Sequence, residues 1–396
     1  MSWEKKPLEQ LGVITSSKRI YKKEYVKSGI PFFRTKEVKE LANGKEIATE
    51  LFISRERYLE ILDKFGVPEE GDILLTAIGT IGEVYVVNNA SPFYFKDGNV
   101  LWLKNFNELS PCYLRYALLS FVDELNALSN GAAYNALPIK KLKQHQVFVP
   151  PKNIQNEIVT VLDKAFADID QARANTEQNL QNARELFDSY LQQVFSERGE
   201  GWKKFVFSDL CEITSKLVDP RESEFLDYPH IGAANITSVT GELTEIKTAR
   251  EEQLKSGKFV FDESMVLYSK IRPYLMKTCR PNFVGLCSAD IYPLVPNKEL
   301  ITRDFLFYLL TTRHFTDYAI SGSSRAGMPK VNRTHLFNYT CHIPSVEEQD
   351  MLVEKLNLMM EKSEELQGIY QSKLAALDEL KQSLLQQAFT GQLTQG

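Results

Sequence analysis

The feature that most constrains this sequence is an internal repeat of nearly half its length. The segment Ser189–Ser196 has the sequence SYLQQVFS, and Ser383–Thr390 has the sequence SLLQQAFT, 194 residues later in a chain of 396. A period of half the chain predicts two copies of one structural unit. We therefore expect two sites of the same general kind.

Four further pairs of segments recur in the same order, with offsets between 192 and 199 residues. Loop insertions and deletions produce a drift of this size, so the matches indicate a duplication rather than chance. The aligned pairs are Trp3–Ser16 with Trp202–Ser215, Asp72–Leu75 with Ser264–Leu267, Tyr113–Tyr116 with Phe305–Tyr308, and Phe148–Gln155 with His342–Gln349.

Each copy ends in a long stretch with helical periodicity. From Ile154 to Phe195, apolar or small residues recur every three or four positions, with one interruption near Thr176. This pattern predicts a helix of roughly 42 residues, about 60 Å long. The second copy repeats the pattern from Leu352 to Ala388, with an interruption at Ser363.

Both helices are expected to begin just after a proline, Pro151 and Pro344, and Gly391 is expected to close the second. Helices of this length cannot bury their apolar faces inside a small domain, so each needs a long partner. The simplest partner is the other copy, in a two-helix coiled coil. The alternative is that each helix packs along its own domain or along another protein.

The net charge of −5 hides two regions of opposite sign. The two predicted helices, 154–200 and 346–389, each hold nine acidic and four basic residues, so the remainder of the chain carries +5. Segment 18–45 holds nine basic residues against three acidic ones, and segment 140–152 holds four basic and no acidic residues. Local charge determines what a surface attracts, so these segments favour an anionic ligand.

Composition and motifs exclude several classes of protein. Apolar and charged fractions are those of a globular protein, no run of 18 apolar residues occurs, and the first residues lack an apolar signal core, so we expect a cytoplasmic protein. No P-loop, dinucleotide-binding, nucleophile-elbow or zinc-protease motif is present, and the five histidines lack metal-binding spacing. Five cysteines without a C-x-x-C pair predict reduced, largely buried thiols.

The two blocks outside the helices, 1–150 and 199–343, have mixed α+β character. Strand-like runs at 72–76, 83–87, 258–261 and 265–268 alternate with turn residues and with short helices near 113–119 and 305–310. The loops differ between copies: Ser129–Ala136 is unlike Ser321–Met328, and Phe32–Lys36 is unlike His230–Asn235. A shared scaffold with two different loop sets predicts recognition of two different targets.

These residues resemble the specificity (S) subunits of Type I restriction-modification enzymes, over essentially the whole chain. The motifs that carry the resemblance are Gly71–Thr76 with Gly79–Gly82, Ser269–Leu275, Pro344 with Glu347–Gln349, and Leu385–Leu393. The first helix start departs from this pattern, because Asn153 and Ile154 stand where the second copy has an acidic pair.

The resemblance implies two pseudo-symmetric target recognition domains, 1–151 and 199–344, separated by two long antiparallel coiled-coil helices, 152–198 and 345–396. Each domain would recognise one half of a split double-stranded DNA target, and the helices would set the unread spacer. The chain itself would be non-catalytic. Two modification subunits carrying S-adenosylmethionine would dock on the helices, and restriction subunits using ATP and Mg would join them.

Lys and Arg supply phosphate contacts, while Arg, Lys, Asn and Gln also discriminate base edges. Arg34 and Arg325 stand out because each lies in a segment that differs between the copies. The DNA-binding candidates are Lys18, Arg19, Lys22, Lys23, Arg34, Lys36, Asn130, Tyr134 and Asn135 in the first block, and Lys216, Asn235, Lys270, Arg272, Ser323, Ser324, Arg325, Lys330 and Asn332 in the second.

Two alternatives stay open. The chain could be a stand-alone coiled-coil DNA-binding protein without a methyltransferase partner. It could also be a nuclease, since Asp227 with Glu245 and Lys247 resembles the carboxylate-plus-lysine group of metal-dependent nucleases. Glu-x-Lys also occurs elsewhere in the chain, at Glu4, Glu37 and Glu379, and the first copy has no matching string.

Overall fold

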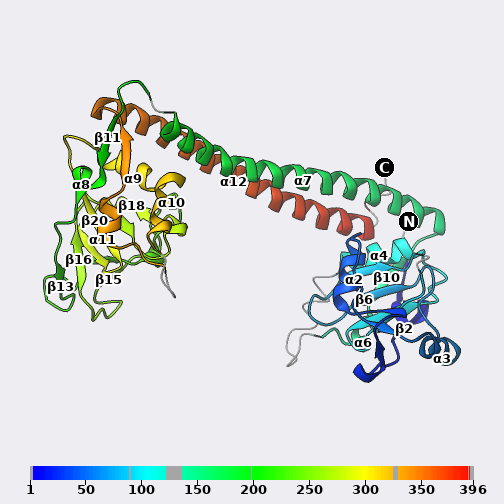
Figure 1. Ribbon diagram of the computed structural model, residues 1–396. Coiled ribbons are helices and arrows are strands. Elements are labelled where there is room, and N and C mark those ends of the chain that lie inside the picture. The colour runs from blue at the N-terminus through cyan, green and yellow to red at the C-terminus, as the bar shows by residue number, and fades with distance from the viewer. Residues whose placement is uncertain are drawn as a thin grey trace. The chain divides into compact units, whose positions relative to one another are not determined.

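The computed structural model describes residues 3–88, 91–121, 136–197, 199–323, 329–390 and 392. The chain forms two compact units, and each contains a globule of mixed strands and helices together with part of both long helices (Figure 1). Unit 1 comprises residues 1–176 and 373–396, and unit 2 comprises residues 177–372. Unit 1 is therefore discontinuous in sequence.

The globule of unit 1 holds two four-stranded sheets and a two-stranded ribbon, with strand orders β2-β9-β6-β7, β3-β5-β4-β8 and β1-β10. Its elements are β1 (Glu4–Pro7), α1 (Leu8–Leu11), β2 (Val13–Ser16), η1 (Lys22–Glu24), β3 (Tyr25–Val26), β4 (Ile30–Phe33), α2 (Thr35–Ala42), β5 (Phe52–Ile53), α3 (Arg55–Phe65), β6 (Ile73–Thr76), β7 (Val84–Val86), β8 (Tyr94–Phe95), β9 (Val100–Lys104), α4 (Pro111–Ser120), α6 (Ile139–Gln144) and β10 (Gln146–Val149).

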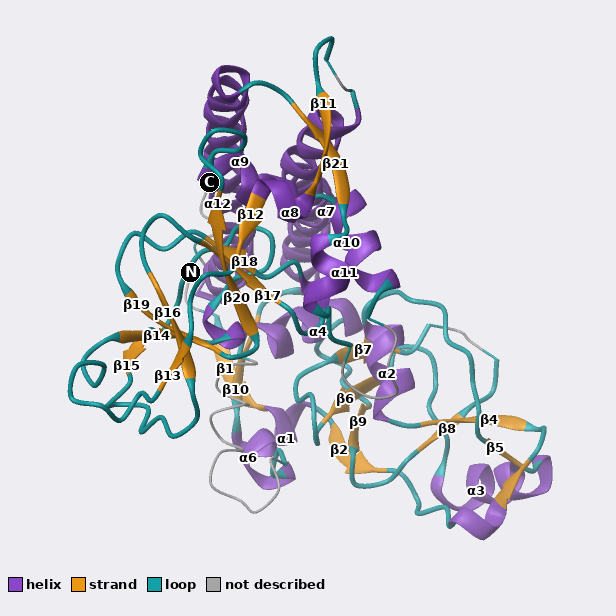
Figure 2. Cartoon of the chain, turned by 60° about the vertical axis from the view of Figure 1, so that its left-hand side comes forward, coloured by secondary structure: helices purple, strands orange, loops and turns teal. Residues whose placement is uncertain are grey.

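The globule of unit 2 holds a four-stranded sheet, a five-stranded sheet and a ribbon, with orders β12-β20-β17-β18, β13-β16-β19-β14-β15 and β11-β21 (Figure 2). Its elements are β11 (Lys203–Val206), α8 (Phe207–Leu210), β12 (Cys211–Glu212), β13 (Leu217–Val218), β14 (Pro229–Ile231), η2 (Ala233–Asn235), β15 (Lys247–Thr248), β16 (Lys258–Phe261), β17 (Val266–Ser269), η3 (Pro273–Leu275), β18 (Thr278–Cys279), β19 (Gly285–Ser288), β20 (Ile291–Pro296), α9 (Arg303–Leu310), α10 (Arg313–Ser321), α11 (Arg333–Phe337) and β21 (Thr340–Ile343).

The two globules repeat one four-stranded sheet and one ribbon, which confirms the predicted duplication and α+β class, whereas their remaining sheets have four strands in unit 1 and five in unit 2. In each, the first strand pairs antiparallel with the last, as β1 with β10 and β11 with β21. Each also has one parallel pair, β4 with β8 and β14 with β19. The four-stranded sheet β2-β9-β6-β7 corresponds strand by strand to β12-β20-β17-β18.

One of the five sequence alignments is wrong by a single residue. The sequence pattern aligned Asp72–Leu75 with Ser264–Leu267, which is an offset of 192. In the structure, the bridge of Ile78 with Ala136 in unit 1 is equivalent to the bridge of Ile271 with Lys330 in unit 2, so Ile78 corresponds to Ile271. Ile73 therefore corresponds to Val266, at an offset of 193. A slip of one residue moves every side chain to the opposite face of a strand, and a continuously apolar strand such as β6, buried on both faces, gives no alternation with which to detect the slip.

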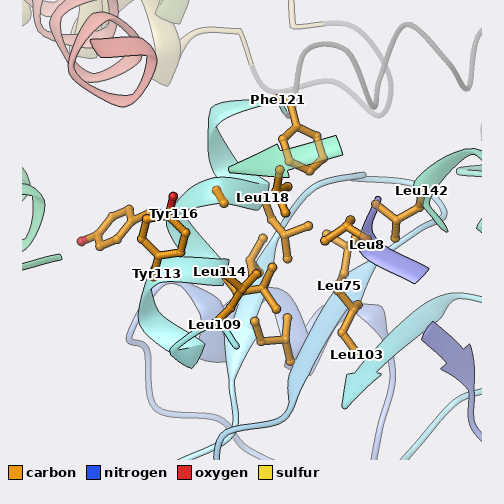
Figure 3. Packing of buried hydrophobic residues seen from close by; sticks show 14 of the residues in the cluster. Leu8, Leu75, Leu103, Leu109, Tyr113, Leu114, Tyr116, Leu118, Phe121 and Leu142 are labelled. Atoms are coloured by element: carbon orange, nitrogen blue, oxygen red, sulfur yellow. The ribbon is translucent and has the colours of Figure 1, made fainter. Parts of the chain in front are cut away.

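The main core of unit 1 lies between the β2-β9-β6-β7 sheet and helix α4. Leu75 and Leu103 from the sheet meet Leu114 and Leu118 from α4, and all four are at most 2% exposed (Figure 3). Burying a side chain of this size contributes about 1.5–3 kcal/mol. In unit 2 the equivalent core is more aromatic, because Tyr268 of β17 lies where unit 1 has Leu75.

The two long helices match the predicted lengths closely. Helix α7 spans Lys152–Ser196 and α12 spans Val346–Thr390, each 45 residues. They pair within both units. In unit 1, Asp170 and Lys381 form an ion pair of 3.3 Å, and Arg173 pairs with Asp378. Residue numbers rise along α7 where they fall along α12, so the two helices run antiparallel. The predicted end of the second helix at Gly391 lies outside the described residues.

The polar interruptions in the two apolar stripes are buried. In unit 2, the hydroxyl of Ser363 on α12 donates to the carbonyl of Ala183 on α7 at 2.7 Å, so it links the helices directly. In unit 1, the hydroxyl of Thr176 donates to Ala172 of its own helix at 2.7 Å. Both residues are at most 3% exposed, and both hydroxyls are satisfied, as buried polar groups require.

A repeated glutamine fixes each long helix to its globule. Gln155 accepts from the Ser110 amide at 2.7 Å and donates to the carbonyls of Pro150 and Glu108 at 2.8 Å. Gln349 repeats all three bonds in unit 2: it accepts from the Thr302 amide at 2.8 Å and donates to the carbonyls of Pro344 and Leu300 at 3.0 and 2.8 Å. Both glutamines are 0% exposed. Ser110 and Thr302 are the N-caps of α4 and α9, so one side chain ties the start of the long helix to the start of the short one.

Four of the five cysteines are buried, as expected, whereas Cys112 is exposed. Burial raises the pKa of the Cys341 thiol to about 12, so it stays protonated at neutral pH. Among the described residues, no helix is both long and apolar enough to span a membrane.

Candidate nucleic-acid interface

Each four-stranded sheet has one edge from which the variable segments leave, which we call the loop edge. In unit 1 it comprises the ends of β2 and β6 and the start of β9, because Ser16 pairs with Leu101 and Thr76 with Val100. In unit 2 it comprises the end of β17 and the start of β20, where Ser269 pairs with Ile291. Side chains that follow these strand ends are therefore gathered at one place in each unit.

The loop edge of unit 2 brings together three predicted cations from two distant segments. Ile271 forms a bridge with Lys330, and the Arg272 amide donates to the Pro329 carbonyl at 2.9 Å. The Val331 amide donates to the Lys270 carbonyl at 2.8 Å. Lys270, Arg272 and Lys330 are thus held on neighbouring backbone positions.

The three cations differ in how exposed they are and in whether an ion pair neutralises them. Asp290 accepts from Lys330 at 2.9 Å and lies 3.7 Å from the Lys270 ammonium, and the hydrogen bond from Lys330 lowers the pKa of the carboxyl. The Lys270 side chain is only 13% exposed, also bonds the Ala289 carbonyl, and has its pKa lowered by burial and by Lys330. Lys270 therefore stabilises the backbone of the loop edge from a largely buried position. Arg272 is exposed and has no ion pair in the described part of the chain.

Lys216 lies beside the five-stranded sheet of unit 2. The pairing of β12 with β20 ends at Glu212 and Val295, and Leu217 pairs with Phe259 of β16. The Lys216 side chain is exposed, and no ion pair neutralises it among the described residues. A phosphate contact by Lys216 stays a prediction.

In unit 1, the cations that follow β2 lie at the equivalent edge. The Lys18 amide donates to the Tyr94 hydroxyl at 2.7 Å, and its ammonium lies 4.9 Å from the centre of the exposed Phe65 ring. Arg19 forms an ion pair of 2.7 Å with Asp97, although its side chain is 65% exposed. The edge is therefore basic but partly neutralised.

Three further predicted lysines of unit 1 are exposed and unpaired among the described residues. Lys22 and Lys23 form the short helix η1, and Lys36 lies in the first turn of α2. Free exposed cations of this kind favour sequence-independent attraction to phosphates rather than base recognition.

Arg34 has an internal structural role instead. Its guanidinium donates to the buried carboxylate of Glu37 at 2.6 Å and to Glu50 at 3.0 Å. Burial opposes the ionisation of Glu37, but the hydrogen bonds from Arg34 outweigh it and lower the Glu37 pKa. A role for Arg34 in binding a ligand stays a prediction, and it would require breaking these pairs.

Three predicted polar residues of unit 2 also serve the local backbone. Asn235 accepts from the Gly232 amide at 2.8 Å and donates to the carbonyls of Thr244 and Glu245 at 3.1 and 3.2 Å. Ser323 is 3% exposed and donates to the Ile320 carbonyl, and Asn332 caps α11 by accepting from the His335 amide at 2.8 Å. Their side chains organise the loops more directly than they present a contact.

Five predicted residues lie outside the described residues: Asn130, Tyr134, Asn135, Ser324 and Arg325. Their positions in sequence immediately precede the bridges of Ala136 and Lys330 to the loop edges.

Sequence reasoning missed two residues at the loop edges. Tyr274 is 50% exposed in the turn that carries Arg272. Lys39 of α2 lies 3.4 Å from both the Thr80 hydroxyl and the Glu83 carboxylate, beside the equivalent turn of unit 1. An aromatic residue beside Arg-Pro in a turn was a usable signal for Tyr274, whereas the position of Lys39 depends on the packing of α2.

The first residue of the nuclease-like string is paired with an arginine. Asp227 forms an ion pair of 3.0 Å with Arg250, whose hydrogen bond lowers the Asp227 pKa. In the described part of the chain, no three His, Cys, Asp or Glu side chains are grouped as a metal ion would require.

A family model described as the Type I restriction modification DNA specificity domain matches residues 1–180 and again 199–371. The chain belongs to this family. It is 35% identical over 196 residues to the Type I restriction enzyme EcoDI specificity subunit of Escherichia coli, a match that covers 49% of this chain and 42% of that protein. It is 30% identical over 161 residues to the putative type I restriction enzyme specificity subunit S.HindORF215P of Haemophilus influenzae, covering 40% of this chain and 38% of the relative.

These two matches span about two fifths of the curated relatives' lengths. Solved structures of the family share the fold over nearly the whole chain. The HsdS subunit from Thermoanaerobacter tengcongensis has a TM-score of 0.62 at 17% identity, covering 98% of this chain and 97% of that one. A chain from a solved type I R-M system has a TM-score of 0.77, also at 17% identity, with 98% of both chains covered.

Proposed function

We propose that this chain is the sequence-recognising subunit of a Type I restriction-modification complex, and that each unit recognises one half of a bipartite double-stranded DNA target. The chemistry belongs to partners: two modification subunits that carry S-adenosylmethionine, and restriction subunits that use ATP and Mg. The residue spans proposed for the recognition domains are 1–151 and 199–344, and those for the spacer helices are 152–198 and 345–396.

The observation that carries the proposal is the duplicated loop edge. One sheet occurs twice, and each copy places cations beside a turn whose sequence differs from its counterpart, as Arg272 differs from Gly79. Cations give affinity for phosphates irrespective of sequence, while side chains on the turns discriminate bases. Two half-sites of different sequence fit two such turns.

The exposed surface of α12 supports helix docking by partners. Met351, Leu358 and Ile369 are 58%, 55% and 53% exposed in unit 2. Their spacings of 7 and 11 residues place them within about 20° of one face of an α-helix. An exposed apolar stripe on an otherwise acidic helix fits a partner helix with apolar and basic residues.

The helices would also set the unread spacer between the half-sites. A seven-residue insertion after Thr176, matched by one after Ser372, keeps the helix faces in phase and adds about 10 Å of length. Because B-DNA rises about 3.4 Å per base pair, the unread spacer should grow by about three base pairs while both half-sites stay the same. An unchanged spacer in the map of methylated sites would contradict this role.

The direct test is to map modified bases in the host genome with and without this chain. We expect a bipartite motif to disappear when the chain is deleted and to return on complementation. The alternative, a stand-alone coiled-coil DNA-binding protein, predicts no change in methylation and no larger subunits purified with the chain. A nuclease predicts cleavage by the isolated chain that Glu245→Gln abolishes.

A further inference from the structure

Each unit contains a surface cavity beside the end of a long helix, and the two cavities are lined from equivalent positions of the duplicated sequence. The cavity of unit 2 has a volume of about 810 Å³ and that of unit 1 about 450 Å³. All eleven lining positions of the smaller cavity have counterparts among the twelve of the larger one, at the offsets of 192, 194 and 199 that define the duplication. We call them the end pockets.

The end pockets include part of the repeated octapeptide. Its inner residues, Leu191 and Leu385, are at most 3% exposed and serve the cores, so packing explains their repetition. Gln192 and Gln386 line the pockets and are also the same. Gln192 accepts from the Arg313 amide at 3.0 Å and donates to the Asp188 carboxylate at 3.1 Å, so it also holds the start of α10.

In each unit, the phenylalanine of the octapeptide packs on an aromatic residue of a short helix. Phe195 packs on Phe305 with ring centres 5.0 Å apart, and Phe389 packs on Tyr113 at 5.2 Å. These contacts attach the end of α7 to unit 2 and the end of α12 to unit 1. Each end pocket is therefore lined by the end of a long helix, a short helix and the β1-β10 or β11-β21 ribbon.

Both end pockets are cationic. Lys5 on β1 and Lys204 on β11 are equivalent, exposed, and without an ion pair among the described residues. The Lys5 ammonium lies 4.5 Å from the centre of the Phe148 ring, its cross-strand neighbour. Among the residues that the structure describes, no aspartate or glutamate lines either pocket. An acidic segment with an apolar side chain complements such a surface.

The end pockets and the loop edges behave in opposite ways across the duplication. The loop edges differ between the units, as two different half-sites require. The end pockets differ in volume and in most lining residues, but they share an identical lysine, glutamine and phenylalanine at equivalent positions, and these three residues fit one common occupant in both units. DNA half-sites do not meet that condition, whereas two copies of one protein subunit do.

We propose that the end pockets are equivalent docking sites for one acidic segment, presented once by each of the two modification subunits. This rests on the proposed function, since it identifies where on this chain the two identical partners are held. Each pocket adds a charge-assisted contact to the apolar contact along the helices.

The test is the stoichiometry of the complex reconstituted from the full chain and the host's modification subunit, measured by native mass spectrometry and titration. We expect the wild-type chain to bind two subunits, and Lys5→Glu or Lys204→Glu to weaken one of the two by about tenfold or more, because the reversed charge repels the acidic segment. The double variant should weaken both.

Lys203→Glu is the matched control. Lys203 adjoins Lys204 on β11 but lies outside this pocket, and unit 1 carries glutamate at the equivalent position 4. This variant should bind two subunits as tightly as the wild type, and all variants should keep the wild-type thermal unfolding midpoint.

The outcomes separate the two proposals. If the wild-type chain binds no modification subunit, the proposed function fails. If it binds two and the pocket variants bind two equally well, the end pockets are not docking sites. Loss of DNA affinity with both subunits retained would also overturn the docking role, because it would assign the lysines to phosphates.

Discussion

The turn after β6 in unit 1 and the turn after β17 in unit 2 occupy the same place in the same sheet, yet they are built differently. In unit 1 the Thr76 amide donates to the Glu83 carbonyl at 3.0 Å, and in unit 2 the Ser269 amide donates to the Lys277 carbonyl at 3.0 Å. The second turn is therefore one residue longer. The first takes its left-handed positions at Gly79 and Gly82, whereas the second takes them at Arg272 and Met276.

This difference shows how one scaffold holds two recognition surfaces. Glycine adopts positive φ without strain, while a non-glycine residue there costs roughly 1–3 kcal/mol. Unit 2 holds Arg272 at a φ of 49° and Met276 at 46°, and the result is an exposed arginine and tyrosine on a rigid turn. Strain of this kind is typical of functional positions.

The common scaffold is where a substitution should have its largest effect. Gln349→Ala leaves the Thr302 amide and two carbonyls without their partner in a buried position, so we expect unit 2 to lose about 3 kcal/mol. Gln155→Ala should cost unit 1 a similar amount. Denaturant unfolding followed at Trp202 for unit 2 and Trp102 for unit 1 measures each separately. The exposed Gln171→Ala on α7 is the control, and equal small losses in all three variants would contradict the role of the glutamines.

The variable turn should give the next largest effect, on DNA rather than on stability. Under the proposed function, Tyr274→Ala should weaken target binding by about 1–3 kcal/mol, the usual contribution of one aromatic side chain stacked on a base. Only the half-site of unit 2 should relax, and the half-site of unit 1 acts as the internal control. Val284→Ala, another exposed side chain of unit 2, should leave the motif unchanged. An unaltered motif in Tyr274→Ala would remove this residue from the interface.

A smaller difference separates the two buried hydroxyls of the long helices. Ser363→Ala removes a hydrogen bond between α12 and α7 and should cost about 1 kcal/mol. Thr176→Val removes a bond within a single helix turn, whose carbonyl acceptor keeps its helical partner, and should cost less. Thermal unfolding of the two variants ranks them, and a larger loss in Thr176→Val would reverse the expected order.

The smallest effect concerns pH, and it distinguishes the parallel strands of the two units. His230 is buried where unit 1 has Phe32, and its Nδ1 lies 2.9 Å from Glu252. Burial lowers the pKa of His230 below 6.5 despite the opposing effect of Glu252. The unfolded chain therefore binds a proton at higher pH than the folded chain, so stability is complete above about pH 6.5 and declines below it.

His230→Phe should remove this part of the decline in unit 2 between pH 7.5 and 5.5, measured through Trp202. Unit 1 of the same variant, measured through Trp102, is the control and should retain its wild-type pH profile. A wild-type decline in unit 2 that persists in His230→Phe would show that Glu252, Lys258 or another group is responsible.

Local and periodic features of the fold were predictable from sequence. The long helices were expected at 154–195 and from 352 onward, and they occur at 152–196 and 346–390. Their signal is strong because one apolar period persists over many turns. The strand offset was wrong by one residue, since β6 and β17 are apolar on both faces and give no alternation to fix their alignment.

The site was less predictable because it depends on contacts between distant segments. Arg34 was selected because its segment differs between the copies, but Glu50, 16 residues away in sequence, and the buried Glu37 neutralise it. Lys270 and Lys330 were selected separately, and only the bridge of Ile271 with Lys330 shows that they share Asp290. The pairing of a charge determines its availability, and sequence does not reveal that pairing.

The discontinuity of unit 1 has a consequence for its synthesis. Its core includes Leu385 and Ala388, which leave the ribosome only after all of unit 2 has been made. At about 5–20 residues per second, the globule that is translated first waits roughly 10 to 40 s with part of its apolar surface uncovered. Unit 2 is continuous in sequence, so it can complete its core as soon as residues 177–372 have been translated. We therefore expect the second half of this protein to complete its core before the first half does.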